Sequence, residues 1–245
     1  MENLSYVSLS QQVALFHQME VTANNIANMN TPGFKSEGIL FKEYVNQAGK
    51  TPARGGNTIS QVEDYATYRN LLQGPMTQTG NKLDAAIGAA EGYFAIETPE
   101  GTRYTRDGGF SLNAQRELVT KSGFRVMSSS GSPVKLQEDA RDITIMGDGS
   151  VSSEQGDIGK LKIVKFDNQQ KLLPVGGNLF DAQGAAEQPL EHPDVAQGAL
   201  EGSNVQPVME MNNMIQLQRM FEAAQRIIMN DHDMQRSMIR KLTEA

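Results

Sequence analysis

The residue types that most often carry chemistry are few and scattered in this chain. It has no cysteine, which excludes disulfides and thiolate metal sites. The histidines His17, His192 and His232 are widely separated, and His17 has no histidine or glutamate four residues further on, so no zinc site is expected. No Gly-x-Ser-x-Gly sequence indicates a serine nucleophile. The sequence therefore predicts no catalytic residue, no metal ligand and no cofactor.

The glycine-rich segment Gly88–Gly92 comes nearest to a nucleotide-binding loop. It lacks the spacing of both nucleotide fingerprints, and no Lys-Ser or Lys-Thr pair follows it. We interpret it as a β-turn in which the backbone approaches a neighbour closely. Acidic residues that are adjacent in sequence would point to opposite faces of a strand, which disfavours a catalytic carboxylate pair.

Composition and charge exclude further classes of function. A chain of 245 residues can bury a sizeable core. The net charge is −7 and no basic patch is present, so nucleic acid is not an expected partner. No apolar run reaches the roughly 18–20 residues of a membrane span, so an integral membrane protein is not expected. Met1–Tyr6 lacks the basic and apolar regions of a secretory signal, and these rules alone predict a cytoplasmic protein.

Hydrophobic spacing predicts a helix over residues 4–29. The apolar residues of this segment recur every three or four positions and form one stripe: Leu9, Val13, Phe16, Met19, Ala23 and Ile26. Asn30–Gly33 ends the helix, because a residue before proline leaves the helical region and glycine permits a turn.

The middle of the chain, residues 38–203, has the pattern of short strands separated by turns rich in Gly, Pro, Asn, Asp and Ser. Regular spacing without intervening helices indicates an antiparallel all-β domain. Segment 47–56 is predicted to be a loop. The expected strands are Tyr93–Ile96, Arg103–Thr105, Gly109–Leu112, Leu118–Thr120, Arg125–Met127, Ile143–Ile145, Lys160–Phe166 and Asn178–Asp181.

A second helix is predicted from Ser203 or Asn204, either of which could cap it, to about Leu242, with Pro207 in the first turn. A heptad-like seam is formed by Met214, Leu217, Phe221, Ala224 and Ile228. We expect it to be interrupted at Asp231 and to continue, after a shift, through Ile227, Met234, Met238 and Leu242.

Neither terminal helix can hide its apolar stripe alone. The two helices could pack on each other or on helices of neighbouring subunits, and periodicity does not decide between these arrangements. Most of the 13 methionines lie in these terminal segments. They suit either an adaptable contact surface or ordinary filling of a helix core.

The fold class predicted from these patterns is α+β, with an antiparallel all-β central domain between N- and C-terminal helices. The expected domains are 1–37, 38–203 and 204–245.

Six runs of residues resemble the signatures of bacterial flagellar rod and hook proteins, in that family's order. They are Ala23–Lys35, Thr79–Ile87, Gly92–Ile96, Tyr104–Phe110, Leu118–Gly123 and Leu200–Val205, the last followed by Glu210-Met211 and Gln218-Arg219. The segment Ala90–Phe94 departs from the family's usual Gly-x-Gly-Phe-Phe. Chain length, the pair Phe221-Glu222 and the opening Met1–Tyr6 resemble the proximal rod subunit more than the distal rod subunit or another axial protein.

The resemblance implies a structural subunit of the basal-body rod, which crosses the periplasm and transmits motor torque to the hook. It implies delivery by the flagellar type III export apparatus, without a cleaved signal peptide. The cytoplasmic location expected from the missing signal peptide would then not apply. The implied partners are copies of this chain and the other proximal and distal rod subunits, and the terminal helices pack into a helical tube. A peptidoglycan-acting enzyme is the remaining alternative, but it would need a buried set of carboxylates that the sequence does not single out.

Residues expected to pack between subunits follow from this resemblance. They lie in the two helices and at the start of the second one: Val13, Phe16, Met19, Ile26, Ser203, Asn204, Val205, Met214, Leu217, Phe221, Ala224 and Ile228. Four asparagines are expected to form hydrogen bonds between subunits or at the helix end: Asn24, Asn25, Asn28 and Asn30.

Overall fold

The structure, a computed structural model, describes residues 2–47, 58–137 and 142–243. The chain divides into two compact units. The first, which we call the helical unit, is drawn from residues 1–27, 37–69 and 206–245. The second, which we call the β unit, consists of residues 28–36 and 70–205.

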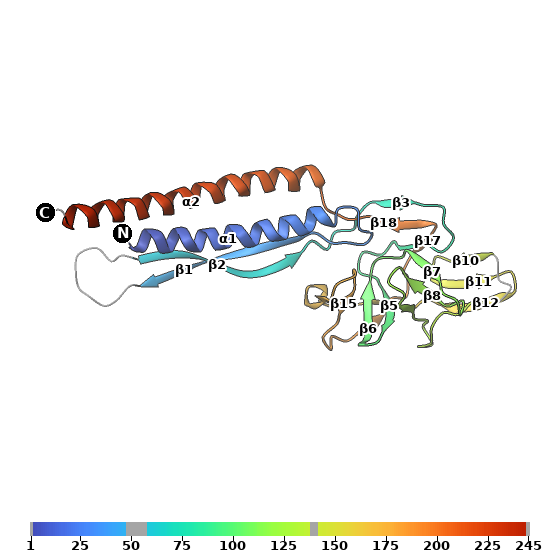
Figure 1. The fold of residues 1–245 in the computed structure, drawn as a ribbon. Helices are drawn as coiled ribbons and strands as arrows, with labels where there is room; N and C mark the ends of the chain where they lie inside the picture. The colour runs from blue at the N-terminus through green and yellow to red at the C-terminus, as the bar shows by residue number, and fades with distance from the viewer. Residues whose placement is uncertain (1, 48–57, 138–141, 244–245) are drawn as a thin grey trace. The chain divides into compact units, whose positions relative to one another are not determined.

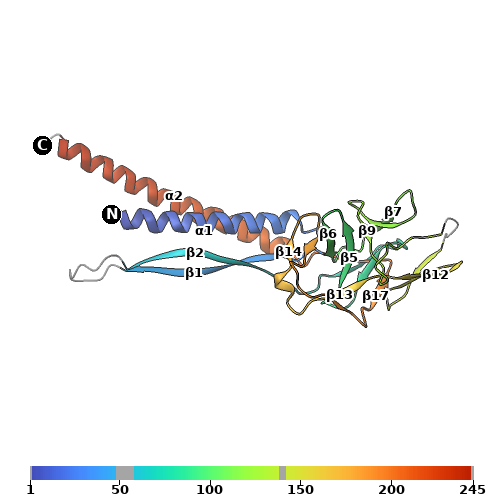
Figure 2. The same ribbon diagram turned by 90° about the horizontal axis from the view of Figure 1, so that it is seen from below.

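The helical unit contains two long helices and one hairpin. Helix α1 spans Glu2–Ala27 and helix α2 spans Pro207–Thr243. Strands β1 (Glu37–Gln47) and β2 (Thr58–Arg69) pair antiparallel, with a bulge at Leu40/Phe41. Helix α1 packs against both α2 and the hairpin, and α2 runs antiparallel to it (Figures 1 and 2).

The helix ends follow the predicted chain breaks only in part. Helix α1 ends just before the turn at Asn28, whose carbonyl accepts a hydrogen bond from the Thr31 amide at 3.1 Å. Helix α2 begins at Pro207, where a proline lacks the amide that a first turn leaves unpaired. The predicted caps Ser203 and Asn204 lie outside α2, because the side chain of Asn204 bonds to backbone groups of the β unit instead.

The β unit is built of short antiparallel strands. Its largest sheet has the order β14-β15-β6-β5-β9-β8-β7, with β13 joining β5 to β16, and β10-β11-β12 form a smaller sheet. Two further pairs, β17 with β4 and β18 with β3, join the end of the unit to its beginning. The strands are β3 Met76–Gln78, β4 Ala85–Ile87, β5 Tyr93–Thr98, β6 Gly101–Thr105, β7 Phe110–Leu112, β8 Leu118–Thr120, β9 Arg125–Val126, β10 Ile143–Ile145, β11 Ser150–Ser153, β12 Gly156–Lys160, β13 Ile163–Lys165, β14 Leu173–Pro174, β15 Phe180–Asp181, β16 Gln188–Pro189, β17 Val195–Gln197 and β18 Ala199–Glu201, with a 3-10 turn at Gln169–Lys171.

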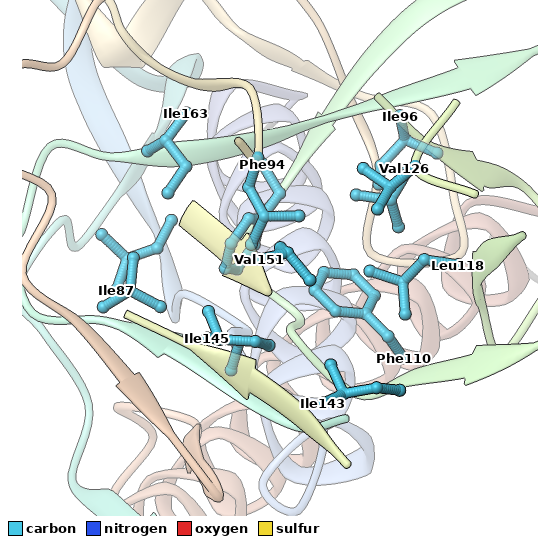
Figure 3. Packing of buried hydrophobic residues seen from close by; sticks show 14 of the residues in the cluster. Ile87, Phe94, Ile96, Phe110, Leu118, Val126, Ile143, Ile145, Val151 and Ile163 are labelled. Atoms are coloured by element: carbon cyan, nitrogen blue, oxygen red, sulfur yellow. The ribbon is translucent and has the colours of Figure 1, made fainter. Parts of the chain in front are cut away.

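Side chains from these sheets converge on one hydrophobic core (Figure 3). Phe94 and Phe110 meet edge to face, with ring centroids 5.1 Å apart, and Ile87, Ile96 and Val126 are completely buried around them. A second cluster of aromatic side chains is formed by Tyr93, Tyr104, Phe166 and Phe180. The β unit therefore has a core of its own.

The predicted fold class, α+β with a β-rich centre, is confirmed. The structure groups the segments differently from the predicted boundaries at 37 and 203. The hairpin 37–69 belongs to the helical unit because it packs on α1, and residues 28–36 belong to the β unit because they bond to residues 200–204. Of the loop predicted over 47–56, Gln47 ends β1 and the rest lies outside the described residues. In the part of the chain that is described, neither helix is long and apolar enough to cross a membrane.

Candidate functional site

A buried ionic cluster of Lys35, Arg106 and Glu201 ties the β unit together. The Glu201 carboxylate accepts hydrogen bonds from Lys35 Nζ through Oε1 and from Arg106 Nε through Oε2, both at 2.6 Å. Its Oε1 also accepts the Gly74 amide at 3.1 Å. The three side chains expose at most 3% of their surface. Charges buried this deeply are tolerated only when paired and hydrogen-bonded, and each of the three is.

Backbone carbonyls surround the Arg106 guanidinium. Its Nη1 donates to the carbonyls of Ala89, Ala90 and Gly92, at 3.1, 3.0 and 2.5 Å, and Nη2 donates to Ile87 at 3.3 Å. The segment Gly88–Gly92, predicted as a turn with close backbone approach, thus wraps around a buried cation. It offers carbonyl oxygens rather than the amides that a phosphate would require.

The cluster holds two cations and one anion, so its charge balance is uneven. Burial, followed by the charge of Arg106, lowers the pKa of the Lys35 ammonium, and the bond to Glu201 opposes this shift. The Leu72 carbonyl accepts a further bond from Lys35 Nζ at 2.8 Å. Glu201 supplies the one negative charge of the cluster, and the side chains of both cations donate hydrogen bonds to it.

The same cluster joins the two terminal signatures of the chain. The Gly33 amide donates to the Glu201 carbonyl at 2.8 Å. Gly33 has φ +71°, and a Cβ there would lie 2.7 Å from the Arg106 carbonyl carbon. Asn178 Nδ2 also donates to the Pro32 carbonyl. The Thr31–Lys35 turn and the Leu200–Val205 segment therefore dock on each other and on Arg106, inside the β unit.

Two of the predicted asparagines brace the backbone from within the chain. Asn204 Oδ1 accepts the Ser36 amide at 2.7 Å, and its Nδ2 donates to the carbonyls of Asn70 and Leu72, both at 2.8 Å. Asn25 bonds to both backbone groups of Glu37, at 2.8 and 2.9 Å.

Ser203 and Val205 are buried, and the Ser203 hydroxyl accepts the Val205 amide at 3.3 Å.

Helix α1 presents three large apolar side chains outward. Leu9, Val13 and Phe16 are 52%, 52% and 50% exposed, and we call them the α1 stripe. At 100° per residue they lie on the side opposite the buried Leu15 and Thr22. The predicted stripe is thus the exposed face over its first half, whereas Met19 and Ile26 are partly buried.

Helix α2 has an inner seam of buried and half-buried side chains. Its members recur every three or four residues without a shift: Met214, Leu217, Phe221, Ala224, Ile228, Asp231, Gln235 and Met238. The predicted shift after Asp231 does not occur, because Asp231 lies in the seam with 5% exposure while Ile227 and Met234 are 44% and 52% exposed. The side chain of Leu242 lies outside the described residues.

The remaining predicted residues lie near the end of α1. Asn24 and Asn30 are exposed and Asn28 is half-buried. The Asn28 Oδ1 atom accepts a hydrogen bond from the Thr31 hydroxyl at 3.1 Å, which stabilises the turn after the helix. Lys35, Arg106 and Glu201 lie within the runs that resemble rod and hook proteins, but the sequence alone predicts no role for them. The available signal is the charge itself: Lys35 and Glu201 are each the single charged residue of their run, and Arg106 shares its run with Asp107.

Three features of the described residues bear on catalysis. They contain no group of three or more His, Asp or Glu that could hold a metal ion. A cavity of about 520 Å³ lies beside β13, but Lys162 on its wall is bonded to Glu187 at 2.6 Å. The deeply buried carboxylate of Glu201 is likewise occupied by two cations.

Three segments of the chain match known protein families. Residues 6–35 match "Flagella basal body rod protein", residues 88–153 match "Flagellar hook protein FlgE/F/G D1 domain", and residues 196–241 match "Flagellar basal body rod FlgEFG protein C-terminal". The ionic cluster has one member at the end of the first segment, one within the second and one within the third.

Full-length relatives carry the same names. The flagellar basal-body rod protein FlgF of Caulobacter vibrioides is 36% identical over 243 residues, which cover 99% of this chain and 98% of the relative. FlgF of Mesorhizobium japonicum is 34% identical, covering 91% and 90%. The basal-body rod protein FlgG of Bacillus subtilis is 35% identical, covering 91% and 92%.

Fold and site define a protein with a self-contained β unit and a helical unit that exposes apolar faces. The sequence matches extend over nearly the whole of the chain and of its relatives. The chain belongs to the family of flagellar basal-body rod proteins.

Proposed function

We propose that this chain is a structural subunit of the flagellar basal-body rod and that it polymerises through its terminal helices to transmit motor torque to the hook. Family membership supports this role, since the relatives are named as basal-body rod proteins. Its partners would be copies of itself and the proximal and distal rod subunits, after delivery by the flagellar export apparatus. No catalytic role is proposed.

The exposed apolar side chains of the helical unit carry this proposal. Besides the α1 stripe, α2 exposes Val208, Met211, Ile215, Met220 and Ile227 by 44–75%. A monomeric protein rarely leaves so many large apolar side chains exposed, and such surfaces usually mark contacts with other proteins. Methionine is common among them, which suits contacts with several slightly different neighbours.

The predicted packing residues divide into two roles in this proposal. Val13 and Phe16 would contact neighbouring subunits directly, together with the accessible edges of Met19, Ile26, Met214, Phe221 and Ile228, and Asn24 and Asn30 would supply polar contacts. The side chains already engaged or buried within the chain would hold that surface in shape: Asn25, Asn28, Ser203, Asn204, Val205, Leu217 and Ala224.

A position in the proximal rod is the finer part of the proposal. The pair Phe221-Glu222 and the opening Met1–Tyr6 support it, and FlgF proteins are among the relatives. FlgG proteins of similar identity keep the distal rod as the second candidate. Labelling of this chain in isolated hook–basal bodies distinguishes the two by the level of the rod at which the label is found.

The test of assembly is complementation of a deletion strain with Phe16→Asp. We expect the variant to be exported and its β unit to fold, but to be missing from purified basal bodies, because a charge cannot be buried unpaired between helices. Gln11→Asp is the matched control, since Gln11 is exposed on the same helix and should be incorporated normally. Normal incorporation of Phe16→Asp would contradict the proposed contact surface.

A further inference from the structure

The exposed surface of α2 is rich in methionine. Five methionines of this helix are 45–56% exposed: Met209, Met211, Met220, Met229 and Met234. Two others, Met214 and Met238, are half-buried in the inner seam. The sulfur atoms of cysteine and methionine are the usual targets of peroxides, and this chain has no cysteine. Its exposed thioethers are therefore the groups that an oxidant meets first.

Three of the exposed methionines lie on one side of α2 together with Ile227. Met209, Met220, Ile227 and Met234 follow one another at intervals of 11, 7 and 7 residues. At 100° per residue they lie within an arc of roughly 40°, and we call them the outer stripe. Ile227 is 44% exposed, so every member of the outer stripe is accessible in the free chain. The α1 stripe, in contrast, contains no sulfur.

We propose that the methionines of the outer stripe are modification sites at which oxidation by hydrogen peroxide controls whether the subunit can assemble; this role rests on the proposed function. The thioether sulfur attacks one oxygen of the peroxide, the O–O bond breaks and an S–O bond forms. Sulfur loses two electrons, and the released hydroxide takes up the remaining proton and leaves as water. Methionine sulfoxide reductases reverse the change, which makes it suitable for control.

The position of these side chains directs the effect of oxidation to assembly rather than to folding. In the free chain the sulfoxide oxygen stays in water, so the helical unit should keep its stability. In a contact between subunits the same oxygen would need a hydrogen-bond donor, which an apolar partner surface does not offer. An oxidised subunit should therefore be folded but excluded from the rod.

The first part of the test uses the purified chain. Peptide mapping after treatment with hydrogen peroxide measures the oxidation of each methionine. We expect Met209, Met220 and Met234 to oxidise several-fold faster than Met214 and Met238. When only the exposed methionines are oxidised, the helical circular-dichroism signal should melt at the native temperature. Equal oxidation rates or a lower melting temperature would overturn the proposal.

The second part replaces the sulfoxide by a permanent polar side chain. In a deletion strain, the double variant Met220→Gln/Met234→Gln should be exported but incorporated into basal bodies several-fold less than the native chain. The matched control is Met76→Gln/Met146→Gln, because these two methionines of the β unit are similarly exposed, by 43% and 52%. The control should be incorporated normally. Equal incorporation of the two double variants would overturn the proposal.

The third part removes the thioethers but keeps the surface apolar. The triple variant Met209→Leu/Met220→Leu/Met234→Leu should be incorporated normally. When hydrogen peroxide is present during expression, its incorporation should fall less than that of the native chain. Equal sensitivity to peroxide would overturn the proposal. Failure of the untreated triple variant would overturn it too, because the shape of the thioether and not its oxidation state would then decide assembly.

Peroxide mapping of purified basal bodies separates this proposal from the function on which it rests. If the outer stripe is oxidised as fast in basal bodies as in the free chain, no subunit covers it, and the proposed contact surface fails. If the outer stripe is protected but Met220→Gln/Met234→Gln is incorporated normally, only the control by oxidation fails. Protection together with loss of incorporation supports both.

Discussion

The β unit and the helical unit distribute polar and apolar residues in opposite ways. In the β unit most large apolar side chains are buried in two clusters, and even the charged side chains of Lys35, Arg106 and Glu201 have the partners described above within the unit. The exposed large apolar side chains of this unit are Leu72, Met76, Met146, Leu173 and Val175. In the helical unit α1 buries Ser8 and Thr22, and the α1 stripe is about half exposed. The β unit is complete as a folded structure, whereas the helical unit lacks something to cover it.

The difference has an energetic consequence for assembly. Covering the exposed half of each side chain in the α1 stripe would contribute roughly 1 kcal/mol per residue, about half the value of a full burial. The α2 surface adds more side chains of the same kind. Contacts between subunits can therefore supply the stability that the helical unit does not obtain within one chain.

The largest expected effect comes from removing the anion of the ionic cluster. Glu201→Gln leaves two buried cations without a counter-charge, and we expect a loss of about 3–5 kcal/mol from the unfolding free energy of the β unit. Urea unfolding followed through the NMR resonances of Tyr93 and Tyr104 reports on this unit, because both side chains lie in its second cluster.

The matched control is another glutamate–arginine pair of the β unit. Glu97 and Arg125 approach to 3.7 Å, with about half of each side chain exposed. Glu97→Gln should change the unfolding free energy by less than about 1 kcal/mol. Similar losses for the two variants would mean that the buried cluster is no more than an ordinary surface pair.

Two neighbouring positions in α1 distinguish residues that stabilise the monomer from residues that stabilise the assembly. Leu15 is 7% exposed and Phe16 is 50% exposed. In the monomeric protein, Leu15→Ala should lower the unfolding free energy of the helical unit by about 2–3 kcal/mol, and Phe16→Ala should lower it by much less. The helical circular-dichroism signal measures this, since both α-helices of the described chain belong to this unit. Phe16→Ala should nevertheless reduce incorporation into basal bodies clearly, although its effect on the stability of the monomer is small.

Docking of the N-terminal signature can be tested with two glycines of equal backbone conformation. Gly33 and Gly80 have φ +71° and +74°, but a Cβ would meet the Arg106 backbone at 2.7 Å only in the first case. Alanine at either position carries a conformational penalty of roughly 1–2 kcal/mol. Gly33→Ala should lower the melting temperature further than Gly80→Ala, and the difference measures the close approach to Arg106. Equal shifts would show that this approach contributes little.

Sequence periodicity predicted the elements whose pattern is local. The terminal helices and most strands from Tyr93 onward lie close to their predicted ranges, because alternation and turn residues within a few positions determine them. The hairpin of β1 and β2 was missed. Its first strand ends at Gln47 and its second begins at Thr58, so no two-residue turn specifies their pairing.

The site could not be predicted because its parts are far apart in the sequence. Lys35, Arg106 and Glu201 meet through the pairing of β18 with β3 and the turn at Gly33, and no local pattern specifies either contact. The interruption predicted at Asp231 was wrong for a different reason. A charged residue in an apolar register suggests a break, but Asp231 is buried in the seam and accepts a hydrogen bond from Gln235. Both errors concern polar groups whose burial depends on distant or specific partners.

The smallest expected effect distinguishes the units by their response to pH. Burial raises the pKa of Glu210 at the start of α2, and a hydrogen bond from Asn25 opposes this shift only in part. Well below its ordinary value of 4.5 the carboxyl is protonated in both folded and unfolded states, so it imposes no penalty. As the pH rises through that value, the unfolded state releases the proton first, and the folded helical unit loses stability until the pH passes the folded pKa. Glu210→Gln should therefore raise the melting temperature of the helical signal near neutral pH and flatten its pH dependence in this window, while the unfolding of the β unit stays unchanged. An equal pH dependence in the variant and the native chain would show that the cost of ionising Glu210 in the folded helical unit is negligible.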